Sequence, residues 1–192
     1  MSKKEKLEKL NKEMLDCKKC TLRKTCTQVV PGEGNADAKI VFIGEGPGKK
    51  EDKIGRPFVG AAGKLLDEML STINLRRKDV YIANAVKCRP PKNRDPVQKE
   101  KDTCWHWLES QLEIIQPKIV VTLGRHSMNL FIPDQKISEV HGKSFEKNFS
   151  NIGKQVIIAL YHPSAAICNG SIKQALIDDF KKIPKVLKKY EK

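Results

Sequence analysis

The chain has 192 residues, of which 39% are hydrophobic and 31% are charged, so it is long enough for one hydrophobic core and has the composition of a globular protein. No apolar run approaches the roughly 18 residues needed to cross a bilayer, and the charged start MSKKEKLEKL lacks the apolar core of a secretory signal, which argues against a membrane-spanning or exported protein. The 37 Lys and Arg against 23 Asp and Glu give a formal charge of +14, which favours a polyanionic partner, nucleic acid first, over a lysine-rich surface that is merely solvated. We expect one domain over residues 1–192, located in the cytoplasm.

Short apolar segments alternate along the chain with segments of helical period. The predicted helices cover residues 3–16, 60–73, 95–115 and 172–187. The predicted strands cover residues 39–43, 79–83, 118–124 and 155–163. Asp95 starts the third helix with Pro96 at its first position, and Pro184 predicts a bend in the last helix.

This alternation of strands and helices predicts the α/β class, because parallel strands need long crossover connections. We expect a central four-stranded parallel sheet between two layers of helices, a three-layer α/β/α arrangement. Ligands in such folds lie beyond the carboxyl ends of the strands. In this sequence those ends read GEGPG, NAVKC, LGRH and YHPSAA.

The turn after the first strand is rich in glycine but matches neither common phosphate-binding motif. A dinucleotide fingerprint needs glycine at its sixth position, which here is Lys49, and the later segment FVGAAGKL lacks the first glycine and the Ser or Thr of a phosphate loop. GEGPG alone is a weak signal that a tight turn would also explain. Phe58, carried thirteen residues after Glu45 in GRPFVG, favours a flat heterocycle over a phosphate, although a core position is the alternative.

Four of the six cysteines have positions that could complete one metal or cluster site. They are the pair Cys17 and Cys20, Cys88 after a strand, and Cys104 in a helix. Zinc and an iron-sulfur cluster both accept four thiolates, so the ligands alone leave the metal open. Cys26 and Cys168 are interpreted as small hydrophobic or incidental thiols.

The ordered segments resemble the family 4 uracil-DNA glycosylases, the iron-sulfur members of the uracil-DNA glycosylase superfamily. The similarity covers nearly the whole chain: the C-x2-C pair, VVPGEGNADAKIVFIGEGPG, EDKIGRPFVGAAGKLLDEML, VYIANAVKCRPPKNRDP, PKIVVTLG, VHGK and YHPSAAI. The resemblance implies the uracil-DNA glycosylase fold and a [4Fe-4S] cluster held by Cys17, Cys20, Cys88 and Cys104. It also implies a monofunctional enzyme that flips uracil out of DNA, hydrolyses its N-glycosidic bond and leaves an abasic site.

The family pattern assigns the base pocket to the strand ends. The implied pocket residues are Gly44, Glu45, Gly46, Phe58, Asn84 and His162. In this pattern Phe58 lies against the uracil face, Asn84 pairs with the Watson-Crick edge, and His162 donates a hydrogen bond to O2 of the departing base. Gly46 stands where the best-known family of the superfamily has the Asp of GQDPYH, so Glu45 is the candidate for positioning water.

The DNA contacts are expected on two segments. Arg89 and Arg94 lie in the cationic segment after Cys88, and Ser164, Ala165, Ala166 and Ile167 belong to the loop that resembles the family's intercalating segment. We interpret His141 as structural and His106 and His126 as helix-surface residues. The expected partner is uracil-containing DNA, single- or double-stranded. We expect the protein to bind it as a monomer and to be associated with the nucleoid through DNA. A sliding clamp is a further candidate partner, although no clear clamp-binding peptide is present.

Two other functions remain open at this point. The first is a noncatalytic iron-sulfur protein that binds nucleic acid or senses redox state, for which Asn84 and His162 would be dispensable. The second is a related glycosylase that prefers another deaminated base, such as hypoxanthine or xanthine.

Overall fold

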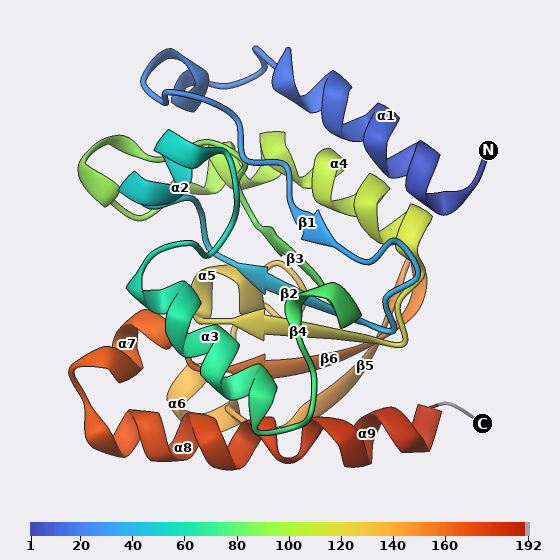
Figure 1. Ribbon diagram of the computed structural model, residues 1–192, viewed down its shortest axis with the longest axis vertical. Helices are drawn as coiled ribbons and strands as arrows, with labels where there is room; N and C mark the ends of the chain where they lie inside the picture. The colour runs from blue at the N-terminus through green and yellow to red at the C-terminus, as the bar shows by residue number, and fades with distance from the viewer. Residues whose placement is uncertain (191–192) are drawn as a thin grey trace.

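The computed structural model describes residues 1–190 and contains a mixed six-stranded sheet in the order β1-β3-β2-β4-β6-β5 (Figure 1). The strands are β1 (Glu33–Gly34), β2 (Ile40–Gly44), β3 (Tyr81–Asn84), β4 (Ile119–Leu123), β5 (Ser144–Phe149) and β6 (Gly153–Leu160). The four central strands are parallel, as predicted, but β1 and β5 extend the sheet at its two edges by antiparallel pairing. The expectation of four strands is therefore corrected to six.

Neither edge strand has the run of apolar residues that is typical of a buried strand. β1 has only two residues, and none of the side chains of β5 is buried. Since β2, β3 and β4 are buried throughout and β6 is buried from Gln155 to Leu160, their apolar runs give a clear signal that the edge strands lack. Polar and short edge strands also avoid pairing with other chains.

Helices cover both faces of the sheet. They are α1 (Lys3–Leu15), α2 (Lys49–Ile54), α3 (Ala61–Ser71), α4 (Gln98–Ile115), α5 (Arg125–Met128), α6 (Ile137–Val140), α7 (Pro163–Ile167), α8 (Gly170–Phe180) and α9 (Ile183–Tyr190), with 3-10 turns η1 (Thr21–Lys24), η2 (Arg77–Asp79) and η3 (Pro91–Asn93). Figure 1 shows α1 and α4 above the sheet and α3, α8 and α9 below it, which is the predicted three-layer arrangement. Within the described part of the chain, no helix has both the length and the hydropathy that crossing a membrane requires.

Alternate residues of β2 supply the two halves of the core, because successive side chains of a strand point to opposite faces. Phe42 stacks on Phe180 of α8 with ring centroids 5.7 Å apart. Val41 and Ile43 instead belong to the cluster that contains Leu108 of α4. The sheet is thereby fixed between the two helical layers.

Two helix boundaries differ from the sequence expectation. α4 begins at Gln98 rather than at Pro96, because the Glu100 carboxylate accepts a hydrogen bond from the Val97 backbone N–H at 2.9 Å and caps the helix there. The last predicted helix is divided into α8 and α9, with the break at residues 181–182, just before Pro184.

Candidate active site

The carboxyl ends of the four parallel strands open into one cleft of about 600 Å³. Its lining includes Glu45 after β2, Asn84 at the end of β3, Gly124 after β4 and His162 after β6, together with Phe58 from the segment between α2 and α3. Gly46 lies in the same wall. The sheet therefore brings together side chains that are far apart in the sequence.

Gly44 fixes how closely Phe58 and Asn84 pack at this cleft. A Cβ atom at Gly44 would lie 2.5 Å from Oδ1 of Asn84 and 2.5 Å from Cζ of Phe58. No side chain other than hydrogen fits at this position without displacing one of the two. The glycine is thus required by the approach of Phe58 to Asn84.

Phe58 is held in an unusual backbone conformation. Its φ of 52° lies in the left-handed region, which costs a bulky residue about 1–2 kcal/mol. Arg77 donates to the carbonyl oxygen of Phe58 and, at 3.1 Å, to that of Pro57. On the other side, Oε1 of Glu51 accepts hydrogen bonds from the N–H groups of Val59 and Gly60 at 2.9 and 2.8 Å. These contacts hold the ring at the cleft, 5.7 Å from the His162 ring by centroids.

His162 is neutral and has a defined tautomer. It is the N-cap of α7, and its Nδ1 accepts a hydrogen bond from the Ser164 backbone N–H at 3.1 Å. Burial lowers the pKa of His162 to about 4, so the imidazole is uncharged at neutral pH. Because Nδ1 accepts, the single proton of the neutral ring resides on Nε2, which can donate to a ligand.

Asn84 is almost fully buried, with 2% of its surface exposed. Its backbone carbonyl accepts a hydrogen bond of 3.0 Å from Nζ of Lys87. Among residues 1–190, no hydrogen bond occupies its carboxamide, which lines the cleft. A buried amide with free donor and acceptor groups is suited to a ligand that offers both.

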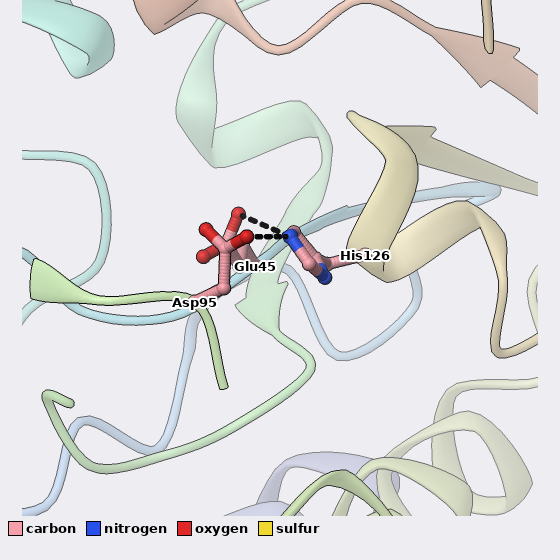
Figure 2. Close-up of side chains that lie close together, drawn as sticks. All are labelled: Glu45, Asp95 and His126. Carbon is pink, nitrogen blue, oxygen red and sulfur yellow. Dashed lines mark ion pairs between the residues drawn. The ribbon is translucent and has the colours of Figure 1, made fainter. Parts of the chain in front are cut away.

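Glu45, Asp95 and His126 form a cluster of titratable side chains in the cleft (Figure 2). Nε2 of His126 lies 3.8 Å from Oε2 of Glu45 and 3.1 Å from Oδ2 of Asp95. Arg125 pairs with the same Asp95 oxygen at 2.5 Å, and its hydrogen bond is the main cause that lowers the pKa of Asp95. Burial raises the pKa of Glu45, while His126 acts in the opposite direction.

The sequence interpretation missed the role of this cluster. His126 was expected on a helix surface, but its side chain is only 14% exposed and lines the cleft, so that prediction is wrong. Asp95 does not cap α4; its carboxylate contacts Arg125 and His126 instead. The available signal was the position of LGRH at the carboxyl end of β4, but the contact partners of a side chain there depend on tertiary structure.

The other two histidines lie away from the cleft lining. His141 Nδ1 lies 2.6 Å from Oδ2 of the buried Asp179 of α8, a position that suits a structural residue. His106 is partly buried on α4, where its ring packs on Trp107.

The two arginines expected to contact DNA differ in how far their guanidinium groups are already paired within the protein. Arg89 is hydrogen-bonded only to Asn93 Oδ1, at 2.7 Å, within the described chain. Arg94 lines the cleft, but its guanidinium forms two hydrogen bonds of 2.9 and 2.6 Å with Glu100, whose side chain is 4% exposed. Its charge is therefore already paired.

The expected intercalating loop is a short helix, α7, which presents only part of its sequence to solvent. Ser164 and Ala165 are exposed and line the cleft, and Ile167 is 48% exposed. Ala166 does not fit the expectation, because it is 1% exposed and packs in the core against the helices. The part of the segment available to DNA is therefore Ser164, Ala165 and Ile167.

The four cysteines of the predicted metal site line one narrow pocket together with Lys87 and Trp107. Nε1 of Trp107 donates to Sγ of Cys17 at 3.3 Å, and the Lys87 backbone N–H donates to Sγ of Cys104 at 3.3 Å. N–H groups directed at sulfur are the contacts that stabilise thiolate ligands. Burial raises the pKa of both Cys88 and Cys104, so without a metal these thiols would stay protonated.

Lys87 supplies a second observation in favour of an anionic group in this pocket. Its side chain is fully buried, and no carboxylate lies within 4.0 Å of its Nζ in the part of the chain described. A buried ammonium is stable only when it is paired or strongly hydrogen-bonded. Four metal-bound thiolates would supply the missing negative charge.

Comparison with known proteins agrees with this geometry. A family model for the uracil DNA glycosylase superfamily matches residues 31–183. Type-4 uracil-DNA glycosylases of Archaeoglobus fulgidus and Thermotoga maritima are 50% and 42% identical to this chain. The alignments cover 93% and 95% of this chain and 92% and 95% of those proteins. A type-4 uracil-DNA glycosylase of Sulfurisphaera tokodaii is 48% identical over 92% of this chain and 83% of its own length. The chain therefore belongs to the uracil DNA glycosylase superfamily and, within it, to the type-4 uracil-DNA glycosylases.

Proposed function

We propose that this protein excises uracil from DNA by hydrolysing the N-glycosidic bond of an extruded deoxyuridine, which leaves free uracil and an abasic site. The observation that carries the proposal is that Phe58, Asn84 and His162 line one cleft at the carboxyl edge of the sheet. A stacked base is inaccessible inside a duplex, so the nucleotide must leave the stack at a cost of roughly a few kcal/mol.

The pocket residues can recognise uracil by its polar edge and its flat face. The ring of Phe58 supplies a surface for stacking, and the Asn84 carboxamide accepts from N3–H of uracil and donates to its O4. Cytosine presents the opposite groups at both positions. A buried amide left unpaired by the wrong base is unfavourable, so Asn84 discriminates against cytosine. The turn from Gly44 to Gly48 crowds the methyl group that distinguishes thymine.

Bond cleavage leaves negative charge on O2 of the departing base and positive charge on the sugar. The Nε2–H of neutral His162 donates a hydrogen bond to O2, a form of stabilisation worth roughly 3 kcal/mol per donor. Glu45 positions water or stabilises the cationic sugar, and Nε2 of His126 lies 3.8 Å from its carboxylate. No covalent intermediate with the protein is needed, so the enzyme is monofunctional.

Cys17, Cys20, Cys88 and Cys104 are the proposed ligands of a [4Fe-4S] cluster. A single zinc ion binds thiolates at about 2.3 Å, which brings four sulfurs to roughly 3.8 Å from one another. Among the described residues, no three cysteine sulfurs lie within 4.8 Å of one another. The four cysteines, which line one pocket, would hold the cluster through their thiolates. A cluster held by these residues would link the segment after α1 to the loop after β3 and to α4, a structural role that needs no electron transfer.

The proposed substrate is uracil in single- or double-stranded DNA, bound by one copy of a single-domain chain of 192 residues. The charge of +14 attracts the phosphate backbone, and Arg89, a half-exposed cation in the segment after Cys88, is a candidate phosphate contact. Ser164, Ala165 and Ile167 on α7 contact the strand from which the base is removed. A sliding clamp is a candidate protein partner.

The test is excision from oligonucleotides that contain uracil opposite G, opposite A or in a single strand, followed by alkaline cleavage of the abasic site. We expect Asn84→Ala and His162→Ala to lower kcat/KM by roughly 10²–10³-fold, with Asn148→Ala on the exposed edge strand β5 as the matched control. Parallel substrates with hypoxanthine or xanthine identify the preferred base. Uncut uracil substrates with a fully iron-loaded protein, or unchanged rates in both variants, would disprove the proposal.

A further inference from the structure

Lys87 lies between the base pocket and the cysteine pocket and belongs to neither set of predicted site residues. It follows β3 by three residues, and its side chain is among the largest that are fully buried. Nζ donates to the Asn84 backbone carbonyl at 3.0 Å and to Oε1 of Gln111 at 2.6 Å. Its own backbone N–H donates to Cys104 Sγ. One residue thus contacts both sites directly.

The surroundings of Lys87 hold the ammonium in a fixed position. Gln111 donates from Nε2 to the Pro31 carbonyl and to the Tyr81 hydroxyl, both at 3.0 Å, which leaves its Oε1 for Lys87. β1 pairs only with Tyr81 and Ile82, so the carbonyl of Asn84 receives a side-chain donor where the edge strand has ended. A rigid frame of this kind transmits a displacement instead of absorbing it.

We propose that Lys87 is a positioning residue that couples the cysteine-bound cluster to uracil recognition. Its ammonium balances the negative charge of the four metal-bound thiolates, and its hydrogen bond to the Asn84 carbonyl orients the peptide that carries the base-reading carboxamide. This inference rests on the proposed function, since it takes Asn84 as the residue that reads uracil. The inference adds an energetic coupling between the two sites. The position of Lys87 that balances the charge of the cluster is also the position that orients Asn84 for uracil.

A link of this kind is reciprocal. If the cluster favours the conformation of Asn84 that binds uracil, bound uracil must favour retention of the cluster. Free uracil should therefore slow the loss of the cluster's visible absorbance when an iron chelator is added. Cytosine, which Asn84 does not pair with, should have no such effect. This readout involves no excision.

The critical variant is Lys87→Met, which keeps an unbranched apolar side chain of nearly the same length and removes its charge and donors. Lys118→Met is the matched control, because Lys118 is exposed at the amino-terminal end of β4, the opposite edge of the sheet from the cleft. Each protein is first assayed for iron and acid-labile sulfide. We expect Lys87→Met to bind free uracil at least about tenfold more weakly and to lose its cluster at the same rate with and without uracil. Wild type and Lys118→Met should both be protected by uracil.

A second variant separates the two roles of Lys87 and remains informative if Lys87→Met fails to take up iron. Gln111→Glu places a carboxylate beside the ammonium while Lys87 can still donate to Asn84. We expect this variant to lose its cluster faster than wild type, because the ammonium is then paired with Glu, and to keep most of its affinity for uracil. Normal uracil protection in Lys87→Met, or a wild-type rate of cluster loss in Gln111→Glu, overturns the inference. If wild-type protein neither binds nor excises uracil, the proposed function fails instead.

Discussion

The imidazole of His162 has one nitrogen engaged by the protein and one left for a ligand. Nδ1 accepts from the Ser164 N–H, and the hydroxyl of Ser164 lies 2.7 Å from the same nitrogen. No hydrogen bond reaches Nε2 from any residue between 1 and 190. A leaving group that acquires negative charge therefore meets a donor whose orientation is set before the base arrives, which is the basis of preorganised stabilisation.

This arrangement predicts the tautomer and the titration of His162. In ¹⁵N spectra of protein labelled at histidine, we expect Nε2 to be protonated and Nδ1 to be unprotonated at neutral pH. The pKa should lie near 4, well below the ordinary value of about 6.5, because burial disfavours the imidazolium. With four histidines in the chain, the spectrum of His162→Gln assigns the signal by its disappearance. A titration near 6.5 would contradict the prediction.

The same shift makes folding stability depend on pH. Between pH 6.5 and about 4 the unfolded chain binds a proton at this histidine and the folded protein does not. The free energy of unfolding contributed by His162 is therefore fully present above pH 6.5 and decreases as the pH falls through this window. Urea denaturation at several pH values should show a shallower decrease for His162→Gln.

At the scale of elements, the segment from α2 to α3 controls where the flat wall of the pocket lies. Glu51 on α2 and Arg77 on η2 hold the two sides of the Phe58 backbone. Arg77 is itself fixed by ion pairs with Glu33 at 2.8 Å and Asp67 at 2.6 Å. The position of Phe58 thus depends on residues from β1, α3 and η2.

This clamp predicts a phenotype for a residue that lies outside the proposed base contacts. We expect Arg77→Gln to lower kcat/KM for uracil excision by about tenfold, mainly through a higher KM, because the ring of Phe58 is no longer held against the base. Arg77→Lys should recover only part of the loss, since Lys lacks the planar fork that reaches two carbonyls. Arg76→Gln is the control, as the neighbouring Arg76 is 71% exposed. Equal activity of Arg77→Gln and Arg76→Gln would show that the clamp has no role in positioning Phe58.

The strands and helices with strong apolar periodicity were predictable from the sequence. The elements that form through pairing at the edge of the sheet or through tertiary contacts were not. The four central strands and the helices that cover them followed from apolar runs and helical spacing. β5 has no buried residue and carries the charged residues Glu146 and Lys147, and α2 consists mostly of charged residues. Their formation depends on pairing with β6 and on the turn after β2, which sequence periodicity does not report.

The candidate site shows the same division. Asn84 and His162 could be placed because each lies at the carboxyl end of a strand, and the carboxyl ends of parallel strands meet at one edge. The approach of His126 to Glu45 and Asp95 could not be predicted, since it joins α5 to two loops through side-chain contacts alone. The buried state of Lys87 was equally hidden, because a lysine in a basic segment is usually exposed.

At the scale of the whole molecule, the positive charge should make DNA binding strongly dependent on salt. Two arginines of the segment after Cys88 differ in what they contribute. Arg89 is available for phosphate, so Arg89→Gln should reduce the slope of log Kd against log salt concentration by about one. Arg94 is paired with the buried Glu100, so Arg94→Gln should mainly lower the melting temperature.

Fluorescence anisotropy with a labelled oligonucleotide between low and moderate salt measures these slopes, and thermal denaturation measures stability. Lys118→Gln, at the amino-terminal edge of the sheet, serves as the control for loss of one charge. A larger change of slope in Arg94→Gln than in Arg89→Gln would show that the pair with Glu100 opens when DNA binds.

The left-handed backbone at Phe58 sets a trade-off between durability and catalysis. A chain that relaxed this residue into an ordinary conformation would recover about 1–2 kcal/mol of folding stability, yet the ring would turn away from the neighbouring carboxamide. Selection for heat resistance alone should therefore tend to erode this feature, and selection for repair should preserve it. Variants evolved for thermal stability without a demand for activity provide a natural place to look for its loss.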